Sequence, residues 1–314
     1  MAEQSSVATP RTTVPVHLEE ARRLAAELAT LPTDELARLL RVNRRIAAEN
    51  HLRYRRFHDS DTPALPALAA YTGIVFKRID PASFSAADLE YAQEHLNITS
   101  FLYGVLRPLD AIRPYRLEGD AVLPGHDEQT LFAYWHERLT DALLDKIRRD
   151  DGILVNLASG EMKRLFDWKR VCREVRVITP EFRICEGDRL KTIVIYTKMC
   201  RGEMTRHILK NRITDLRRFK PSNGRVSGSI PPSAAATTGH LPCNKLQEAQ
   251  KRTENRTTHY KASYACAPKT RFSSGLRESA ENRLLVVAAE RVKLFGRTVF
   301  DPGVADAQTR DVRI

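Results

Sequence analysis

Apolar positions in the first half of the chain recur with the period of an amphipathic helix. They fall every three or four residues over 16–30, 86–96 and 130–149, which is the spacing that one buried helix face requires. Thr33 precedes two acidic residues, as at a helix N-terminus, and Ser85–Asp88 resembles a capping box. The chain up to about residue 150 is therefore predicted to be mainly helical.

After this point the pattern changes to short apolar runs that are typical of strands. Gly152–Ser159 and Glu174–Pro180 each predict a buried strand, and 181–198 predicts a hairpin that turns at Glu186–Asp188. Its second arm, Leu190–Thr197, is apolar on both faces, so we expect it at the centre of a sheet, with a helix directly after it. The predicted fold class is mixed α/β (α+β): one compact domain in which helices surround a mixed central sheet.

The composition changes again near Pro221. Residues 221–240 are rich in Ser, Pro, Gly and Ala, which is typical of a linker or a disordered segment. Only one later stretch, about 276–295, has the periodicity of an amphipathic helix. We therefore divide the chain into a domain at 1–220 and an atypical basic tail at 221–314, which is predicted to be disordered.

The positive charge of the chain is unevenly distributed. The formal net charge is +12, yet residues 1–162 carry 19 Lys and Arg against 24 Asp and Glu. Residues 163–220 carry 17 against 7, and residues 221–314 carry 15 against 8. A concentrated positive field favours contact with a phosphate backbone or an anionic membrane surface, although charged runs are often only solvated faces.

Other features narrow the class of protein. No apolar run approaches the ~18–20 residues of a membrane span, and the N-terminus lacks the apolar core of a signal peptide. The five cysteines are odd in number and form no Cys-x-x-Cys pair or Cys/His ligand cluster. We therefore expect a cytoplasmic protein with free thiols, no metal, no cofactor and no membrane partner.

The strongest local set of basic residues lies in the segment YTKMCRGEMTRHILKNR. Lys198 is expected at the end of the strand, Arg201 and Gly202 in the turn, and Arg206 and Lys210 on one face of the following helix. A helix N-terminus carries partial positive charge and free amides, so a phosphate there would be doubly favoured. The alternative is a basic amphipathic helix whose apolar residues pack into the core.

A second candidate is the segment LYGVLRPLDAIRPYRLEGD, in which two Arg-Pro steps interrupt any regular element. Three arginines could line a groove and two tyrosines could stack on nucleic-acid bases. These residues are Arg107, Arg113, Arg116, Tyr103 and Tyr115. In the alternative, Asp110 and Glu118 pair with the arginines inside the protein. The charges balance, so the residues alone leave both interpretations open.

An enzyme is a further alternative. Asn156, Ser159 and Glu161 follow a predicted strand, and many α/β proteins bind ligands at the carboxyl ends of strands. Asp110 and Glu118 could supply an acid and a base. The chain has no Gly-rich phosphate loop, no Gly-x-Ser-x-Gly elbow and no His-Glu-x-x-His motif. The enzyme alternative is therefore a nucleotide- or nucleic-acid-processing protein that uses clustered carboxylates.

Several motifs occur in the order and spacing of a known family. The chain resembles the YaaA family of bacterial peroxide stress proteins over about residues 14–220, through YTGIVFKRI, LYGVLRPLDAIRPYRLEGD, TLFAYW, VNLASGEM and YTKMCRGEMTRHILKNRI. The residues that match the family motifs are Tyr71, Gly73, Tyr103, Gly104, Arg107, Asp110, Tyr115, Arg116, Glu118, Asn156, Ser159, Glu161, Lys198, Arg201, Gly202 and Arg206.

The resemblance implies a single α/β domain of the cantaloupe fold and a cytoplasmic role under oxidative stress. It also implies binding of duplex or distorted duplex DNA through a positively charged cleft and a helix-hairpin-helix element. The role that it suggests is to limit DNA damage, together with control of free iron. The Arg-Pro segment would then shape a wall of the cleft, and the basic helix would supply charge beside it.

Both ends of the chain depart from the family pattern. Family members usually begin with a short apolar strand and a Ser-x-Ala-Lys-Thr motif, whereas this chain starts with MAEQSSVATPRTTVP. We hypothesise a start codon assigned too late, so that the opening strand is missing. After Phe219 the composition also departs from the family, and a frameshift near residues 215–225 is the favoured explanation. A genuine DNA-binding tail is the alternative.

Overall fold

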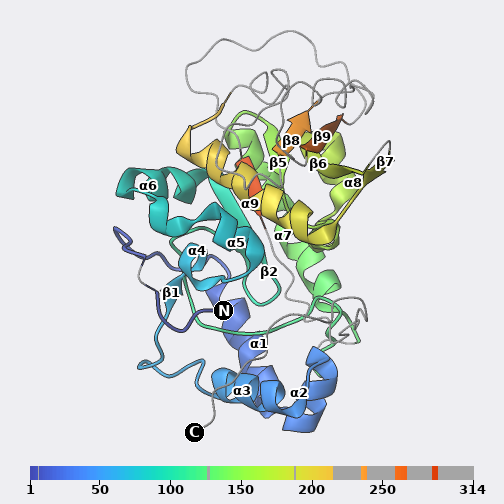
Figure 1. Cartoon of the computed structure of the whole chain (residues 1–314). Coiled ribbons are helices and arrows are strands. Elements are labelled where there is room, and N and C mark those ends of the chain that lie inside the picture. The colour runs from blue at the N-terminus through green and yellow to red at the C-terminus, as the bar shows by residue number, and fades with distance from the viewer. Residues whose placement is uncertain are drawn as a thin grey trace, which may run out of the picture.

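Helices and strands are mixed along the part of the chain that the structure describes. The computed structural model describes residues 1–5, 7–125, 128–186 and 189–214, together with three later segments at 235–238, 259–266 and 285–288. Figure 1 shows helices arranged around a central sheet. The predicted mixed α/β fold class is therefore confirmed.

Three helices near the N-terminus pack together at one end of the molecule (Figure 1). They are α1 (Leu18–Thr30), α2 (Thr33–Leu40) and α3 (Arg44–Arg55). The apolar face of α1 is buried. Asn43 caps α3, because its side chain accepts a hydrogen bond from the Ile46 amide at 2.9 Å. The helices predicted over 16–30 and from Thr33 are confirmed.

The following segment leads through short elements into the sheet. It contains β1 (Leu65–Pro66), α4 (Ala67–Ala70), α5 (Ile74–Ile79), the 3-10 helix η1 (Pro81–Ser83), α6 (Ala86–His95), β2 (Leu96–Ser100), β3 (Gly104–Leu106) and β4 (Ala111–Ile112). The predicted capping box precedes α6. The Ser85 hydroxyl accepts from the Asp88 amide at 3.2 Å, and the Asp88 carboxylate accepts from the Ser85 amide at 3.1 Å.

The remaining part of the chain supplies most strands of the large sheet. It contains α7 (Leu131–Arg149), β5 (Ile153–Asn156), the 3-10 helix η2 (Gly160–Leu165), α8 (Trp168–Glu174), β6 (Arg176–Glu186), β7 (Arg189–Lys191), α9 (Val194–Lys210), β8 (Ala235–Thr238), β9 (His259–Cys266) and β10 (Leu285–Ala288). The predicted hairpin is confirmed, since β6 pairs antiparallel with β7 and Glu186 lies opposite Arg189. The helix predicted over 130–149 is α7.

The large sheet has the strand order β3-β2-β10-β5-β6-β9-β8, with β7 also paired to β6. β10 runs parallel to β2 on one side and to β5 on the other, so it lies between them. β5 pairs in parallel with β6, whereas the β2–β3 and β6–β9 pairs are antiparallel. The sheet is therefore mixed, and two of its inner strands, β10 and β9, come from the segment that the sequence assigns to a tail.

The structure corrects the helix predicted over 276–295. Leu285–Ala288 form strand β10 instead, because hydrogen bonds from strands on both sides outweigh the local helical pattern of a short apolar segment. The rest of that stretch lies outside the described residues, as does most of 221–314, for which disorder was predicted.

The long strand predicted over Leu190–Thr197 is also wrong. β7 ends at Lys191, and α9 begins at Val194. The apolar side chains here are not central in the sheet: Val194 is 68% exposed and Ile195 is 53% exposed. Their β-branched character favours a strand only where neighbouring strands bury both faces, and that condition is not met here.

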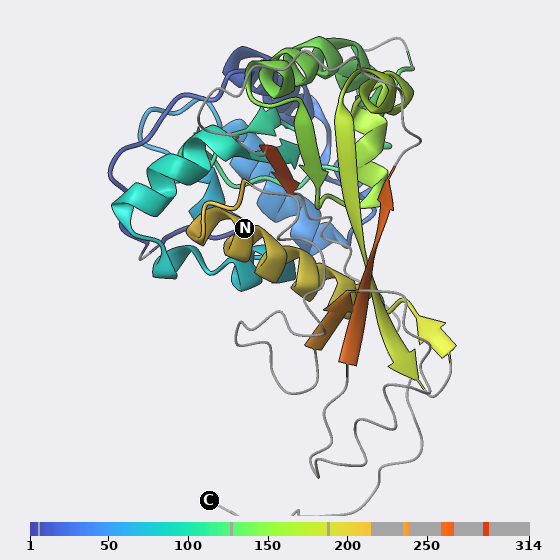
Figure 2. The same cartoon turned by 90° about the horizontal axis from the view of Figure 1, so that it is seen from above.

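Helices cover both faces of the large sheet. α7 contacts β3 and β5, and α8 contacts β6, while α9 contacts β6 and β10. Figure 2 shows α7 and α8 on one side of the strands and α5 and α9 on the other. Among the helices described, none is both long enough and apolar enough to cross a membrane.

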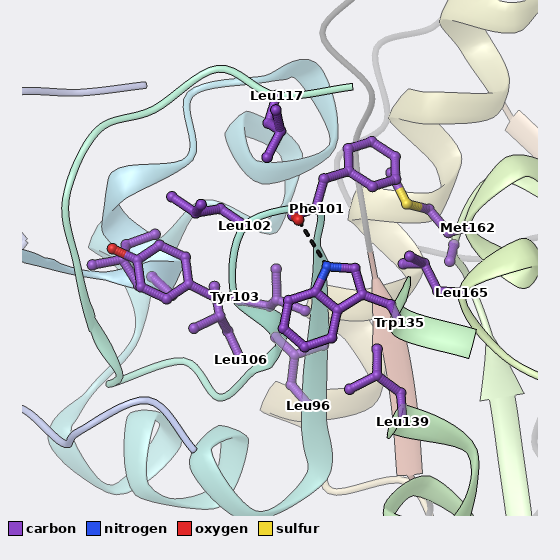
Figure 3. Packing of buried hydrophobic residues seen from close by; sticks show 14 of the residues in the cluster. Leu96, Phe101, Leu102, Tyr103, Leu106, Leu117, Trp135, Leu139, Met162 and Leu165 are labelled. Carbon is purple, nitrogen blue, oxygen red and sulfur yellow. Dashed lines mark hydrogen bonds between the residues drawn. The ribbon is translucent and has the colours of Figure 1, made fainter. Parts of the chain in front are cut away.

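Trp135 on α7 is the largest side chain that the core buries completely. Its indole Nε1 donates a hydrogen bond to the carbonyl oxygen of Phe101 at 2.8 Å (Figure 3). The indole also lies against Gly104, whose φ is +68° and where a Cβ would come 2.8 Å from the ring. Glycine alone tolerates both this backbone conformation and this contact. Trp135 therefore fastens the turn between β2 and β3 to α7.

Trp135→Phe should lower the free energy of unfolding by about 2 kcal/mol. The substitution leaves a void and removes the donor to a carbonyl of the buried Phe101. Urea denaturation followed by circular dichroism measures the change. Trp168→Phe is the matched control, because Trp168 is only partly buried and its indole donates no hydrogen bond within the described part of the chain. Equal losses in the two variants would contradict this role of Trp135.

Asp151, in the turn between α7 and β5, makes stability depend on pH. One carboxylate oxygen accepts from the Ile153 amide at 3.1 Å, and the other is buried without a partner among the described residues. Burial raises the pKa of Asp151 from 3.8 to about 6. The folded protein thus keeps a proton that the unfolded chain releases, so stability is lost as pH rises through this window.

We expect this carboxyl to cost the folded protein about 1 kcal/mol between pH 4 and pH 7, since partial exposure to solvent reduces the full effect of the pKa shift. Asp151→Asn removes the titrating carboxyl, so the free energy of unfolding of this variant should fall about 1 kcal/mol less between pH 4 and pH 7 than that of the unsubstituted protein. Urea denaturation at both pH values measures the difference. Identical pH dependence in the two proteins would show that Asp151 does not titrate in this range.

Candidate functional site

Helix α9 carries all four basic residues that the sequence assigns first to phosphate contacts: Lys198, Arg201, Arg206 and Lys210. Their expected placement around a strand end and a turn is wrong. α9 begins at Val194, one turn before Lys198, so these residues lie within the helix and not at its N-terminus. A phosphate bound by them would be held by side chains and not by free helix amides.

Gly202 serves the packing of α9 against α5. A Cβ at this position would overlap the carbonyl oxygen of Val75 and come 2.6 Å from the Cβ of Arg78. The missing side chain therefore lets two helices approach each other, whereas the sequence predicted that Gly202 lies in a turn. Arg78 and Glu203 form an ion pair across the same contact at 3.3 Å.

Arg206 and Lys210 hold the end of α9 to the segment between α5 and α6. The Arg206 guanidinium donates to the Ser83 hydroxyl at 3.1 and 3.2 Å and lies 3.6 Å from the Asp80 carboxylate. The Lys210 ammonium lies 3.3 Å from the Asp88 carboxylate. Both cations therefore have partners inside the protein.

Arg201 has no such partner. Its guanidinium is half-buried, and burial lowers its pKa. No acid or hydrogen-bond acceptor pairs with this side chain within the part of the chain that is described. Lys198, also half-buried, precedes it by three residues, which places the two side chains on neighbouring positions of one helix face. A partly desolvated, unpaired cation is costly, and a bound anion would offset that cost.

In the Arg-Pro segment, Arg107 pairs with Asp110. The Arg107 guanidinium donates to the Asp110 carboxylate at 3.0 and 3.2 Å, and its backbone amide donates to the same group at 2.8 Å. Thr13 adds a hydroxyl hydrogen bond at 2.6 Å. Asp110 is fully buried. This carboxylate joins two distant parts of the chain.

Arg113 and Arg116 are also engaged internally. Arg113 donates to the backbone carbonyls of Asp59 and Thr62 at 2.8 and 3.2 Å. Arg116 lies 3.3 Å from the Glu118 carboxylate, and both side chains are largely buried. The alternative in which these arginines pair inside the protein therefore describes their contacts better than a DNA-lining groove does.

The tyrosines of this segment are placed differently from the sequence expectation. Tyr103 is 1% exposed and Tyr115 is 9% exposed, so neither ring can stack on a base in this conformation. The Tyr115 hydroxyl bonds to those of Ser100 and Tyr71 at 2.7 and 2.8 Å, and the Tyr103 hydroxyl accepts from the Arg113 amide at 3.0 Å. Burial raises the pKa of Tyr103 and Tyr115, which act as neutral hydrogen-bonding groups in the core.

The polar residues after β5 are partly engaged. The Asn156 amide donates to the Thr179 hydroxyl at 3.4 Å, and its oxygen accepts from the Ala158 amide at 3.2 Å. The Ser159 hydroxyl is buried and has no partner among the residues described. Glu161 follows in η2. The two other carboxylates of the enzyme alternative are each buried against an arginine, as described above, and no set of three metal-ligating side chains gathers in the described part.

One feature that the sequence interpretation missed is a cavity of about 600 Å³ beside α7. Asn97 and Lys146 line it. The available signal was a single asparagine within the apolar start of β2, but nothing local shows which helix covers that strand.

The comparisons with known proteins agree on one family. A family model described as "Peroxide stress protein YaaA" matches residues 1–225. A UPF0246 protein of Bacteroides thetaiotaomicron is 61% identical over 213 residues, which are 68% of this chain and 83% of that protein. UPF0246 proteins of Parabacteroides distasonis and Alteromonas mediterranea are 45% and 32% identical, over 68% and 79% of this chain and 85% and 95% of their own lengths.

Gly202→Ala should lower the free energy of unfolding by about 1 kcal/mol. Helix propensity alone favours alanine by about 1 kcal/mol, but overpacking against the backbone of Val75 costs about 1–3 kcal/mol and outweighs it. Gly160→Ala is the control, because nothing lies within 4 Å of a Cβ there. Thermal or urea denaturation measures both. A stabilised Gly202→Ala protein would show that α9 and α5 can separate freely.

Proposed function

This chain belongs to the YaaA peroxide stress protein family, and from that premise we propose a function. The protein acts in peroxide stress by binding DNA through α9. The family membership supports a role in peroxide stress. DNA binding, a cytoplasmic location and the limitation of DNA damage, with control of free iron, are the finer parts of the proposal. The basic cleft and the helix-hairpin-helix element implied by the resemblance remain predictions.

The observation that carries the proposal is the guanidinium of Arg201, which has no partner among the residues that the structure describes. Other cations of α9, at positions 206 and 210, already bond to residues near α6. Arg201 is partly desolvated without a compensating acid among the described residues, and a phosphate group, which offers two oxygens to the guanidinium, is an acceptor that arginine binds in a bidentate manner. Lys198, one turn earlier on the same face, would add a second positive charge.

The wider charge distribution supports the same proposal. Residues 163–220 carry ten more basic than acidic residues, and this segment includes the end of η2 together with α8 and α9. Lys169, Arg173 and Arg176 are exposed in it. Such a surface attracts a polyanion from a distance and binds it with strong salt dependence. The enzyme alternative has no comparable support, because its best carboxylates are buried in ion pairs.

The test is fluorescence anisotropy of the full chain on duplex and bubble DNA across a salt series. Arg201→Gln and Lys198→Gln should weaken binding on any sequence, and each should reduce the salt slope by about 1. Point variants are preferable to truncation after residue 220, because truncation removes β10 from between β2 and β5.

Two control variants distinguish the loss of a specific phosphate contact from the loss of one positive charge anywhere on the protein. Arg206→Gln removes a cation of the same helix that already bonds to Ser83, so we expect a smaller loss of affinity. Arg22→Gln removes an exposed arginine on α1 that pairs with Glu19 at 2.7 Å, and binding should be unchanged. Equal effects of all four substitutions would contradict a site on α9.

A further inference from the structure

A cavity of about 600 Å³ lies against α7, one of the helices that cover the large sheet. Its walls come from α7, from the end of α6, from β2 and β3, and from the residues just before α1. This volume is typical of small-molecule sites. The cavity contains none of the residues assigned above to DNA contacts on α9, so its role is a separate question.

Two buried polar atoms at this cavity lack partners. Asn97 is 2% exposed; its oxygen accepts from the Lys146 ammonium at 2.9 Å, but its amide nitrogen meets no acceptor among the described residues. His95 is 4% exposed, and its Nδ1 bonds to the Tyr91 carbonyl at 2.6 Å. A carbonyl only accepts, so Nδ1 donates this hydrogen bond; Nε2 has no partner in the described chain and is an acceptor in the tautomer that carries its proton on Nδ1.

Charged side chains of both signs line the cavity: the basic ones are Arg107, Lys146 and Arg149, and the acidic ones are Glu94, Asp145 and Asp150. Lys146 keeps N–H donors beyond its bond to Asn97, and burial lowers its pKa even though the charge of Glu94 acts in the opposite direction. The nearby Arg107 is already paired with Asp110. Glu94, by contrast, is an exposed carboxylate on the cavity wall, next to His95 in the chain. The cavity wall therefore presents both donors and acceptors.

We propose that this cavity binds a free α-amino acid with an apolar side chain. Its carboxylate lies on the Lys146 ammonium and the Asn97 amide, and its ammonium donates to His95 Nε2 and faces Glu94. The side chain packs on Val105, Leu139 and Leu143, the apolar part of the wall.

A zwitterion satisfies the site where simpler ligands do not. A plain carboxylate would pair with the donors and leave Nε2 of His95 without a proton donor. A plain amine would do the reverse and leave the amide of Asn97 unpaired. Each buried polar atom left without a partner costs affinity, so only a ligand with both groups gains from the whole site.

The test uses three probes of nearly equal shape on the full chain: L-leucine, 4-methylpentanoate, which lacks the ammonium, and 3-methylbutylamine, which lacks the carboxylate. Titration calorimetry should show L-leucine binding at least roughly tenfold more tightly than either analogue, which corresponds to one well-placed hydrogen bond to a charged group. Equal affinities for the three, or no binding of L-leucine, would overturn the proposal.

Variants locate the binding. Lys146→Met keeps most of the side-chain volume and should weaken L-leucine roughly ten- to hundredfold while leaving 3-methylbutylamine unchanged. Lys77→Met, an exposed lysine on α5, is the control and should not alter either affinity. If Lys146→Met binds L-leucine as tightly as the unsubstituted protein does, the ligand does not bind at Lys146 and the proposal is overturned. DNA affinity should be the same in all these proteins, so failure here leaves the proposal for α9 untouched.

A measurement on the unsubstituted protein covers the case in which Lys146→Met does not fold. The side-chain amide signal of Asn97 in a ¹H–¹⁵N NMR spectrum should shift when L-leucine is added, because its free N–H gains an acceptor. It should shift much less with 3-methylbutylamine. No shift of this signal at saturating L-leucine would overturn the assignment of the carboxylate to Asn97.

Discussion

The close contact of α9 with α5 at Gly202 determines where the basic residues of this protein can act. Because no side chain intervenes, α9 lies directly on the backbone of Val75, and its last turn is tied by Arg206 and Lys210 to the segment that leads into α6. These contacts fix the rotation of α9. Arg201 is thereby left half-buried without an acid among the described residues, so an anion bound at this point of α9 would offset the cost of its burial.

In the Arg-Pro segment, charged side chains are buried because each has a partner inside the protein. Asp110 receives bonds from Arg107 and from Thr13, and Arg113 satisfies backbone carbonyls of a loop that has no regular structure. Removal of one member of such a pair leaves the other buried and unpaired, which is costly. The rigidity of this segment therefore serves the scaffold, and its charge density is no measure of affinity for DNA.

Strand β10 joins β2, which lines the cavity, to β5 within the large sheet. In its register, Val287 lies opposite Asn97 of β2 on one side and Asn156 of β5 on the other. The polar floor of the cavity and the polar end of β5 are thus held at a fixed separation by a segment far along the chain. The strand belongs to the region that departs from the family pattern, so this region takes part in the fold of the domain.

The sequence by itself determined the elements whose signals are local: the amphipathic α1 and α7, the capping box of α6 and the hairpin of β6 and β7. It also identified the family through motifs, and the basic residues of α9. Tertiary structure alone decided where α9 begins, which arginines have internal partners, and that 285–288 forms a strand between β2 and β5. It alone brought Lys146 to Asn97. These features depend on contacts between residues far apart in the chain, which local periodicity and propensity do not encode.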